Sequence, residues 1–185
     1  EYLRTNHLTL AEQYLRQAHT IAPQSLSVVH ELGVALFLRG DLDEAAALFE
    51  QAAGLVPGRR AGGLRATAAV AREPSVFMLG HCHRKAGRFA QAIAAYEAAL
   101  AIQPSAASTH AALGFTHHVC GSAHEAIVHY HHALALKPDD SFTAELLTRA
   151  LADAVEDLPP PEPPAPYEPL DPAAARARGQ QMEVA

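Results

Sequence analysis

The chain has 185 residues and a formal net charge of −6 with its 12 histidines counted as neutral. This acidic balance excludes the global basic field that is typical of nucleic-acid-binding proteins. Two cysteines are too few for a disulfide framework, and no apolar run approaches the roughly 20 residues that cross a bilayer, so the composition indicates a reducing, intracellular setting.

The chain repeats one pattern three times. Leu-Gly recurs at Leu32-Gly33, Leu79-Gly80 and Leu113-Gly114, and each pair is followed at matching distances by a second glycine, an alanine, an aromatic residue, another alanine and a proline. These positions are Gly40, Gly87 and Gly121; Ala45, Ala92 and Ala126; Phe49, Tyr96 and Tyr130; Ala52, Ala99 and Ala133; and Pro57, Pro104 and Pro138. The pattern is that of the tetratricopeptide repeat (TPR), a unit of about 34 residues with two antiparallel helices. Its usual opening tryptophan is replaced here by Val29, Val76 and His110.

The repeat predicts an all-α fold, a TPR superhelix (α-solenoid) followed by a disordered Pro-rich tail. Because a helix pair cannot bury its apolar face alone, the units are expected to stack and to enclose a concave groove. Small residues are expected where helix backbones approach closely, and Gly40, Gly87 and Gly121 where the first helix of each unit ends. The predicted segments are 1–25, the second helix of a truncated TPR; 26–59, a TPR; 60–72, a basic Gly/Arg loop insertion; 73–106 and 107–140, two further TPRs; 141–157, a terminal capping helix; and 158–185, the tail.

The start of the sequence, the insertion at 60–72 and the tail at 158–185 are each open to interpretation. The sequence begins without Met and with half a unit, so we expect a fragment of a longer protein. The insertion is interpreted as a solvated loop, with a docking site as the alternative. The tail is interpreted as a linker, with a PxxP ligand for an SH3-type domain as the alternative.

Histidines crowd residues 117–132. The stretch HEAIVH resembles the zinc-protease motif H-E-x-x-H, but His129 follows His124 by five positions, which turns the two side chains nearly opposite on a helix. His124, His129, His131 and His132 are predicted on the outer, solvent-facing side, without the four convergent ligands of a structural zinc site. We therefore predict no metal site beyond adventitious binding by a histidine pair, no cofactor and no catalytic residue. Cys82 and Cys120 are predicted to be small packed thiols.

The first helix of each unit lines the groove of a TPR array, and its positions here carry aromatic residues with cationic interruptions. Such a surface suits an amphipathic or extended peptide with apolar anchors and some acidic groups. The alternative is that the phenylalanines pack between neighbouring repeats. The predicted groove residues are His30, Val34, Phe37, Phe77, His81, Arg84, Lys85, Phe115, His118, Phe142 and Arg149.

Four strings are more particular than a generic TPR. They are VVHELGVALFLRGDLDEAAALFEQA (28–52), LGHCHRKAGRFAQAI (79–93), SAASTHAALGFTHHVCG (105–121) and HYHHALALKPDDSFTAELL (129–147). Together they resemble the C-terminal TPR region of the Cdc16-type subunit of the anaphase-promoting complex/cyclosome, a multi-subunit ubiquitin ligase of the cell cycle. The resemblance covers about residues 1–150 and includes the extra residues between the first two complete units.

The resemblance implies a non-catalytic scaffold in the nucleus and cytoplasm, with other subunits as partners and no nucleic acid or membrane. It also implies that the groove wraps the N-terminal segment of a small accessory chain, and that the repeats which mediate homodimerisation in that family are missing from this sequence. Other TPR adaptors remain as alternatives: a sister subunit of the same ligase, a co-chaperone, or the TPR portion of a glycosyltransferase.

Overall fold

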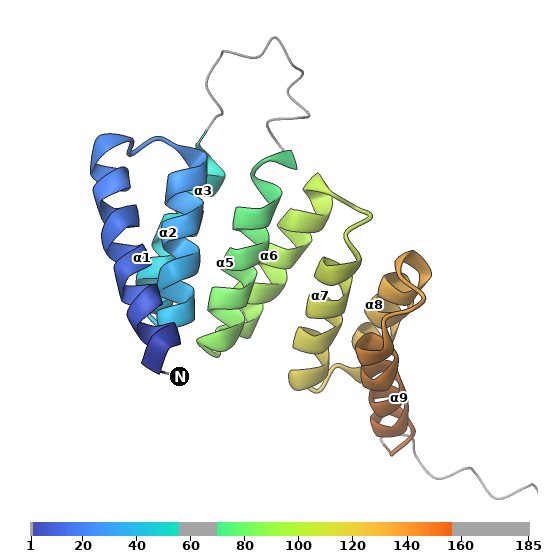
Figure 1. Cartoon of the computed structure of the whole chain (residues 1–185). Coiled ribbons are helices and arrows are strands. Elements are labelled where there is room, and N and C mark those ends of the chain that lie inside the picture. The colour runs from blue at the N-terminus through green and yellow to red at the C-terminus, as the bar shows by residue number, and fades with distance from the viewer. Residues whose placement is uncertain (1, 56–69, 157–185) are drawn as a thin grey trace, which may run out of the picture.

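The computed structural model describes residues 2–55 and 70–156 (Figure 1). Within these residues the secondary structure is helical and contains no strand, which confirms the predicted all-α TPR fold. Residues 60–69 of the predicted insertion and the whole predicted tail lie outside the described residues. The helices are α1 (Tyr2–Ile21), α2 (Leu26–Arg39), α3 (Leu42–Gly54), α5 (Glu73–Lys85), α6 (Phe89–Ile102), α7 (Ala107–Val119), α8 (Ala123–Leu136) and α9 (Ser141–Glu156).

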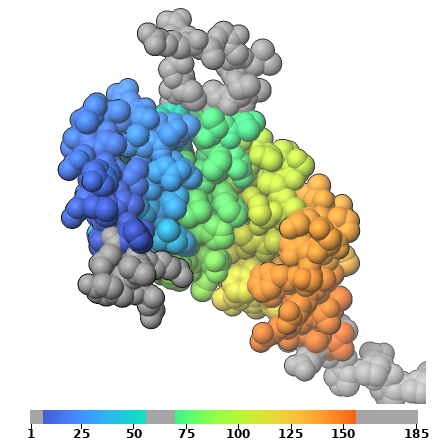
Figure 2. Space-filling model, in the orientation of Figure 1, coloured from blue at the N-terminus to red at the C-terminus, as the bar shows by residue number. Residues whose placement is uncertain are grey.

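The helices stack in chain order. Helices α2 and α3, α5 and α6, and α7 and α8 form three antiparallel pairs, flanked by α1 at one end and α9 at the other (Figure 1). Figure 2 shows the same order from blue to orange across the surface. Each helix packs mainly on its neighbours in the sequence, and α3 packs on α5 across the insertion. The array is therefore a solenoid held together by local contacts.

Glycines end the first helix of each complete pair. Gly40, Gly87 and Gly121 have φ angles of 103°, 75° and 79°, in the left-handed region that side chains with a Cβ avoid. At the end of α2, the Gly40 N–H donates to the carbonyl oxygens of Leu36 and Phe37 at 2.9 and 3.2 Å. The predicted role of these glycines in the turns is confirmed, and it lets each second helix fold back on the first.

A glycine-to-ring contact fixes the distance between the two helices of each pair. A Cβ added at Gly33, Gly80 or Gly114 would lie 2.9, 2.5 or 2.9 Å from an aromatic ring of the second helix. The rings are Phe49, Tyr96 and Tyr130, and each of these residues is 0% exposed. The close approach predicted at these glycines is thus between the backbone of one helix and the ring of its partner.

The two cysteines have different environments. Cys82 is fully buried in the cluster formed by α2, α3 and α5, so the prediction of a packed thiol is confirmed for it. For Cys120 that prediction is wrong, because the residue follows the last residue of α7 and is exposed where the chain turns toward α8.

None of the described helices is both long enough and apolar enough to cross a bilayer.

Candidate peptide-binding groove

A pocket of about 420 Å³ opens between α5, α7 and α9, and we call it the central pocket. It gathers five of the predicted groove residues, Phe77, His81, Arg84, Phe115 and Phe142, from three successive layers of the array. Helix periodicity places them together because α5 and α7 present matching positions of their repeats to the same side. The other residues that line the pocket are Ser108, Ala111, Ala112, Asp140, Thr143 and Leu146.

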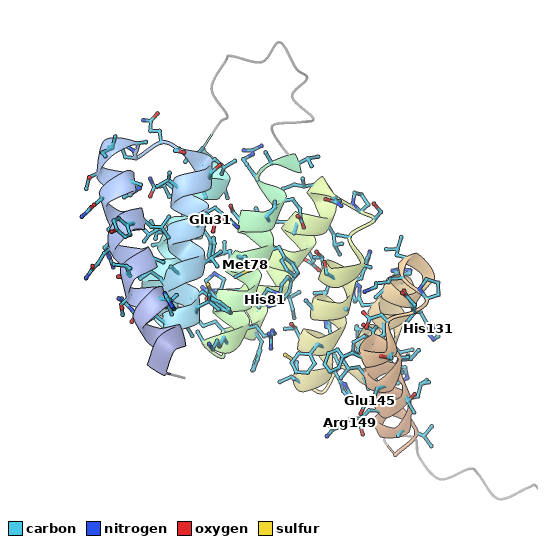
Figure 3. All side chains as sticks on the ribbon, in the orientation of Figure 1. Glu31, Met78, His81, His131, Glu145 and Arg149 are labelled. Carbon is cyan, nitrogen blue, oxygen red and sulfur yellow. The ribbon has the colours of Figure 1, made fainter. Side chains whose placement is uncertain are left out.

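A second pocket of about 290 Å³, the lateral pocket, adjoins the first. Phe115 and Leu146 line both, so the two form one continuous surface. His118 and Arg149 were predicted in the groove and line the lateral pocket with Val119 and Asp153. The His118 Nε2–H donates to the Asp153 carboxylate at 2.6 Å, which joins α7 to α9. Figure 3 labels Arg149 and Glu145 on α9 and His81 on α5.

Phe37 and Lys85 extend the aromatic row from the central pocket toward α2. The Lys85 Nζ lies 4.9 Å from the centroid of the Phe37 ring, and that ring is 6.5 Å from the ring of His81. A cation above an aromatic face is attracted by the negative potential of the ring. These two residues therefore continue the alternation of apolar and cationic groups, although neither lines the central or the lateral pocket.

His30 and Val34 lie between repeats and line neither of these pockets. His30 Nδ1 is 2.9 Å from the Ser75 hydroxyl oxygen on α5, and its ring lies 5.5 Å from the ring of Phe49. Val34 is half-buried against the core cluster of α2, α3 and α5. For these two residues the contacts are those of packing within and between repeats, although their sequence positions predicted them in the groove.

His81 is a polar residue that lines the central pocket. The Tyr96 hydroxyl donates to His81 Nδ1 at 3.1 Å, Arg84 Nη2 is 3.4 Å from the same atom, and the ring packs edge-on against Phe77 with centroids 4.4 Å apart. Burial, followed by the nearby Arg84, lowers the pKa of His81 to about 4. The imidazole is therefore neutral at neutral pH.

The positive charge of the central pocket comes from Arg84. Its guanidinium carbon lies 5.1 Å from the centroid of the Phe115 ring, within the range of a cation–π contact. The side chain is thus held against α7 while it borders the pocket. An acidic group of a ligand that enters beside Phe115 would meet this guanidinium.

Two carboxylates belong to the same surface, and sequence reasoning missed them. Asp140 lines the central pocket, and it also caps α9 by accepting hydrogen bonds from the Thr143 hydroxyl at 2.9 Å and the Thr143 N–H at 3.3 Å. These bonds lower the pKa of Asp140. Asp153 accepts from His118 as described above. An Asp before an apolar helical run is an N-cap signal that could have placed Asp140; nothing in the sequence near Asp153 indicates its partner.

The histidine-rich segment is partly buried, against expectation. His124, His131 and His132 are exposed as predicted, but the prediction is wrong for His129, which is half-buried against α7. Its ring stacks on that of His117, with centroids 5.5 Å apart and planes 8° from parallel. Burial, followed by the neighbouring His117, His110 and His132, lowers the pKa of His129 to about 4. The structure thus brings together imidazoles from α7 and α8 that are far apart in the sequence.

Family comparison agrees with the repeats found in the sequence. Residues 2–68 match the family described as Tetratricopeptide repeat, and residues 80–119 match the family described as TPR repeat.

Curated relatives come from plants and animals. Anaphase-promoting complex subunit 6 of Arabidopsis thaliana is 37% identical over 153 residues, which are 83% of this chain and 27% of that protein. Cell division cycle protein 16 homolog of Mus musculus is 34% identical over 147 residues, 80% of this chain and 23% of that protein. The chain therefore spans about a quarter of the length of the curated relatives it matches.

A solved structure with the same arrangement is the crystal structure of the APC/C hetero-tetramer Cut9-Hcn1. Its matching chain superposes with a TM-score of 0.68 and 27% sequence identity, over 81% of this chain and 28% of that one. The likeness therefore extends across most of the solenoid of this chain.

Proposed function

Because this chain is a tetratricopeptide-repeat protein related to the Cdc16-type subunits of the anaphase-promoting complex, we propose that it is a non-catalytic scaffold segment of such a ubiquitin ligase. In this role it contributes to protein ubiquitination during cell-cycle progression by holding other subunits. The proposal includes residence with that complex in the nucleus and cytoplasm. Its binding function is assigned to the surface made by the central and lateral pockets.

The convergence of three phenylalanines in the central pocket carries the proposal. Phe77, Phe115 and Phe142 come from α5, α7 and α9, so a ligand that touches all three must cross successive layers of the array. An extended segment or a helix can do this, whereas a compact small molecule cannot use the whole surface. Arg84 favours a ligand with acidic groups between its apolar anchors.

The proposed ligand is the N-terminal segment of the small accessory subunit of the complex. The related crystal structure is of an assembly of Cut9 with Hcn1, and its fold matches this solenoid over most of the chain. The phenylalanine-lined surface offers such a segment its apolar anchor sites. Other subunits contact the rest of the scaffold in the same proposal.

Replacing Phe142 with Ala tests this assignment at the residue whose side chain is least committed to packing. Phe142 is 65% exposed, so its removal leaves the core intact. We expect the dissociation constant of a labelled peptide with the accessory subunit's N-terminal sequence to rise by about 10-fold or more, because a central aromatic anchor contributes about 1.4 kcal/mol or more. Fluorescence anisotropy with the 185-residue chain measures this change.

The control is Val155→Ala. Val155 lies on the same helix and is also 65% exposed, but it lines neither pocket. Equal affinities for wild type, Phe142→Ala and Val155→Ala would remove the central pocket from the binding surface. Failure of the folded wild-type chain to bind the peptide would contradict the proposed partner.

Phe77 and Phe115 are less clean probes of the same surface. Phe77 packs against Tyr96 with ring centroids 5.9 Å apart, and Phe115 packs on the cluster of Ala126, Tyr130 and Ala150. Their truncation is expected to lower both affinity and stability, since each residue serves the pocket and the core. For Phe77 and Phe115 variants, the loss of affinity must therefore be compared with the loss of stability, which the melting temperature measures.

A further inference from the structure

The third helix pair carries imidazoles at four positions between its helices where the other two pairs carry mostly apolar residues. His110 and His117 of α7 and His129 and His132 of α8 occupy four positions of the repeat where the two helices meet. The matching positions hold Val29, Leu36, Leu48 and Gln51 in the first pair, and Val76, His83, Ala95 and Ala98 in the second. Only the third pair has histidine at all four. Polar groups in place of buried apolar ones destabilise a helix pair unless they find partners.

The ring nitrogens of three of these histidines lie close together. One ring nitrogen from each of His110, His129 and His132 lies within 4.8 Å of the other two. A zinc ion with Zn–N bonds of about 2.0–2.1 Å in tetrahedral geometry holds its nitrogens about 3.4 Å apart. The required contraction is at most about 1.4 Å per pair, and the exposed side chain of His132 is free to rotate for it.

Hydrogen bonding prepares His110 for this role. Its Nε2–H donates to the Pro104 carbonyl oxygen at 3.1 Å, which leaves Nδ1 with its lone pair. In metal-binding histidines the N–H of the second ring nitrogen commonly donates a hydrogen bond to a backbone carbonyl in this way. That bond fixes the tautomer and orients the ring. The Nδ1 atoms of His110 and His129 are buried and have no hydrogen-bond partner among the described residues.

We propose that His110, His129 and His132 form a binding site for a divalent transition metal such as Zn²⁺ between α7 and α8. Three neutral imidazoles suit Zn²⁺, and a fourth position remains for water or a group from another molecule. His117 is a positioning residue that stacks on His129. The site is separate from the proposed peptide surface, because none of its residues lines the central or the lateral pocket. A bound ion clamps the two helices of this pair together.

The test uses the 185-residue chain without a histidine tag, freed of metal by a chelator and dialysed. Titration with Zn²⁺ against a chromophoric competitor is expected to show one ion per chain with a dissociation constant below about 1 µM. The melting temperature is expected to rise by about 5 °C or more at a hundredfold excess of Zn²⁺ over that constant. Co²⁺ bound in place of Zn²⁺ is expected to give the intense visible bands of four-coordinate geometry.

Two matched variants decide the assignment. His110→Ala/His132→Ala removes two proposed ligands and is expected to weaken Zn²⁺ binding at least about 100-fold. His124→Ala/His131→Ala removes two exposed histidines of α8 that lie outside the cluster, and is expected to bind like wild type.

Equal losses in the two double variants, or binding by wild type no tighter than about 100 µM, would show adventitious surface binding and overturn the proposal. If the first variant loses its helical circular dichroism, the single variant His132→Ala replaces it, because this side chain is exposed. Unchanged affinity in that folded variant also overturns the proposal.

Discussion

A Gly80→Ala variant is expected to unfold with a free energy about 2 kcal/mol below that of wild type. The added Cβ would lie 2.5 Å and 2.6 Å from two ring carbons of Tyr96, far inside van der Waals contact. Tyr96 is fully buried, packs with Ala92 and Leu113, and is tied to His81 by its hydroxyl, so the ring has little room to move. Overpacking of this kind costs about 3 kcal/mol, and the better helix propensity of Ala offsets about 1 kcal/mol.

Urea denaturation followed by circular dichroism measures the loss, and Gly54→Ala is the control. Gly54 ends α3, and a Cβ there meets no atom within 4 Å, so this variant is expected to be unchanged or slightly more stable. Combining Gly80→Ala with Tyr96→Leu is expected to cost less than the sum of the single changes, because the smaller side chain makes room. Equal stabilities for Gly80→Ala and Gly54→Ala would show that the glycine-to-ring contact does not set the helix spacing.

Acidification from pH 7.5 to pH 5 is expected to remove about 2 kcal/mol of stability through His81 alone. The pKa of this residue falls from about 6.5 in the unfolded chain to about 4 in the folded protein. Between these values the unfolded state binds more protons, so stability is retained above pH 6.5 and is lost as the pH falls toward 4. Burial also lowers the pKa of His30, His83 and His129, and these groups add to the loss with the same sign.

His81→Asn tests the contribution of His81, because the Asn side-chain oxygen can accept the Tyr96 hydroxyl that Nδ1 accepts in wild type. The free energy of unfolding is measured by urea denaturation at pH 7.5 and at pH 5, with a chelator present. Its difference between the two pH values is expected to be about 2 kcal/mol smaller in this variant than in wild type. His131→Asn, a change at an exposed histidine labelled in Figure 3, is the control. Identical pH dependence in wild type and His81→Asn would contradict the assignment.

The repeat pattern predicts most of the fold because its key positions act locally. The glycine seven residues after each Leu-Gly pair has a positive φ angle in the turn that follows the first helix. The aromatic residue sixteen positions after the glycine of Leu-Gly contacts that glycine within the same helix pair. Contacts between units are less visible in the sequence. His30 and Val34 stand at groove positions by count, yet the packing of α2 on α5 draws them into the interface between repeats.

The histidines show the same limit more sharply. Spacing along α8 relates His124, His129, His131 and His132 to one another, and by that criterion no ligand set exists. The missing member is His110, which stands nineteen positions before His129 and meets it only when α7 and α8 fold back on each other. A comparison of aligned repeat positions, in place of spacing within one helix, is the signal that could have found it.

Helix α9 supplies one wall of the central pocket, yet it packs mainly on α8 and only lightly on α7. Helix α9 makes less packing contact than α5 or α7 in the described residues, so it is expected to open at lower free energy than the other two walls. A peptide bound across α5, α7 and α9 would hold α9 against the other two helices. Occupancy is then expected to slow amide hydrogen exchange most in α9, which packs mainly on one neighbour.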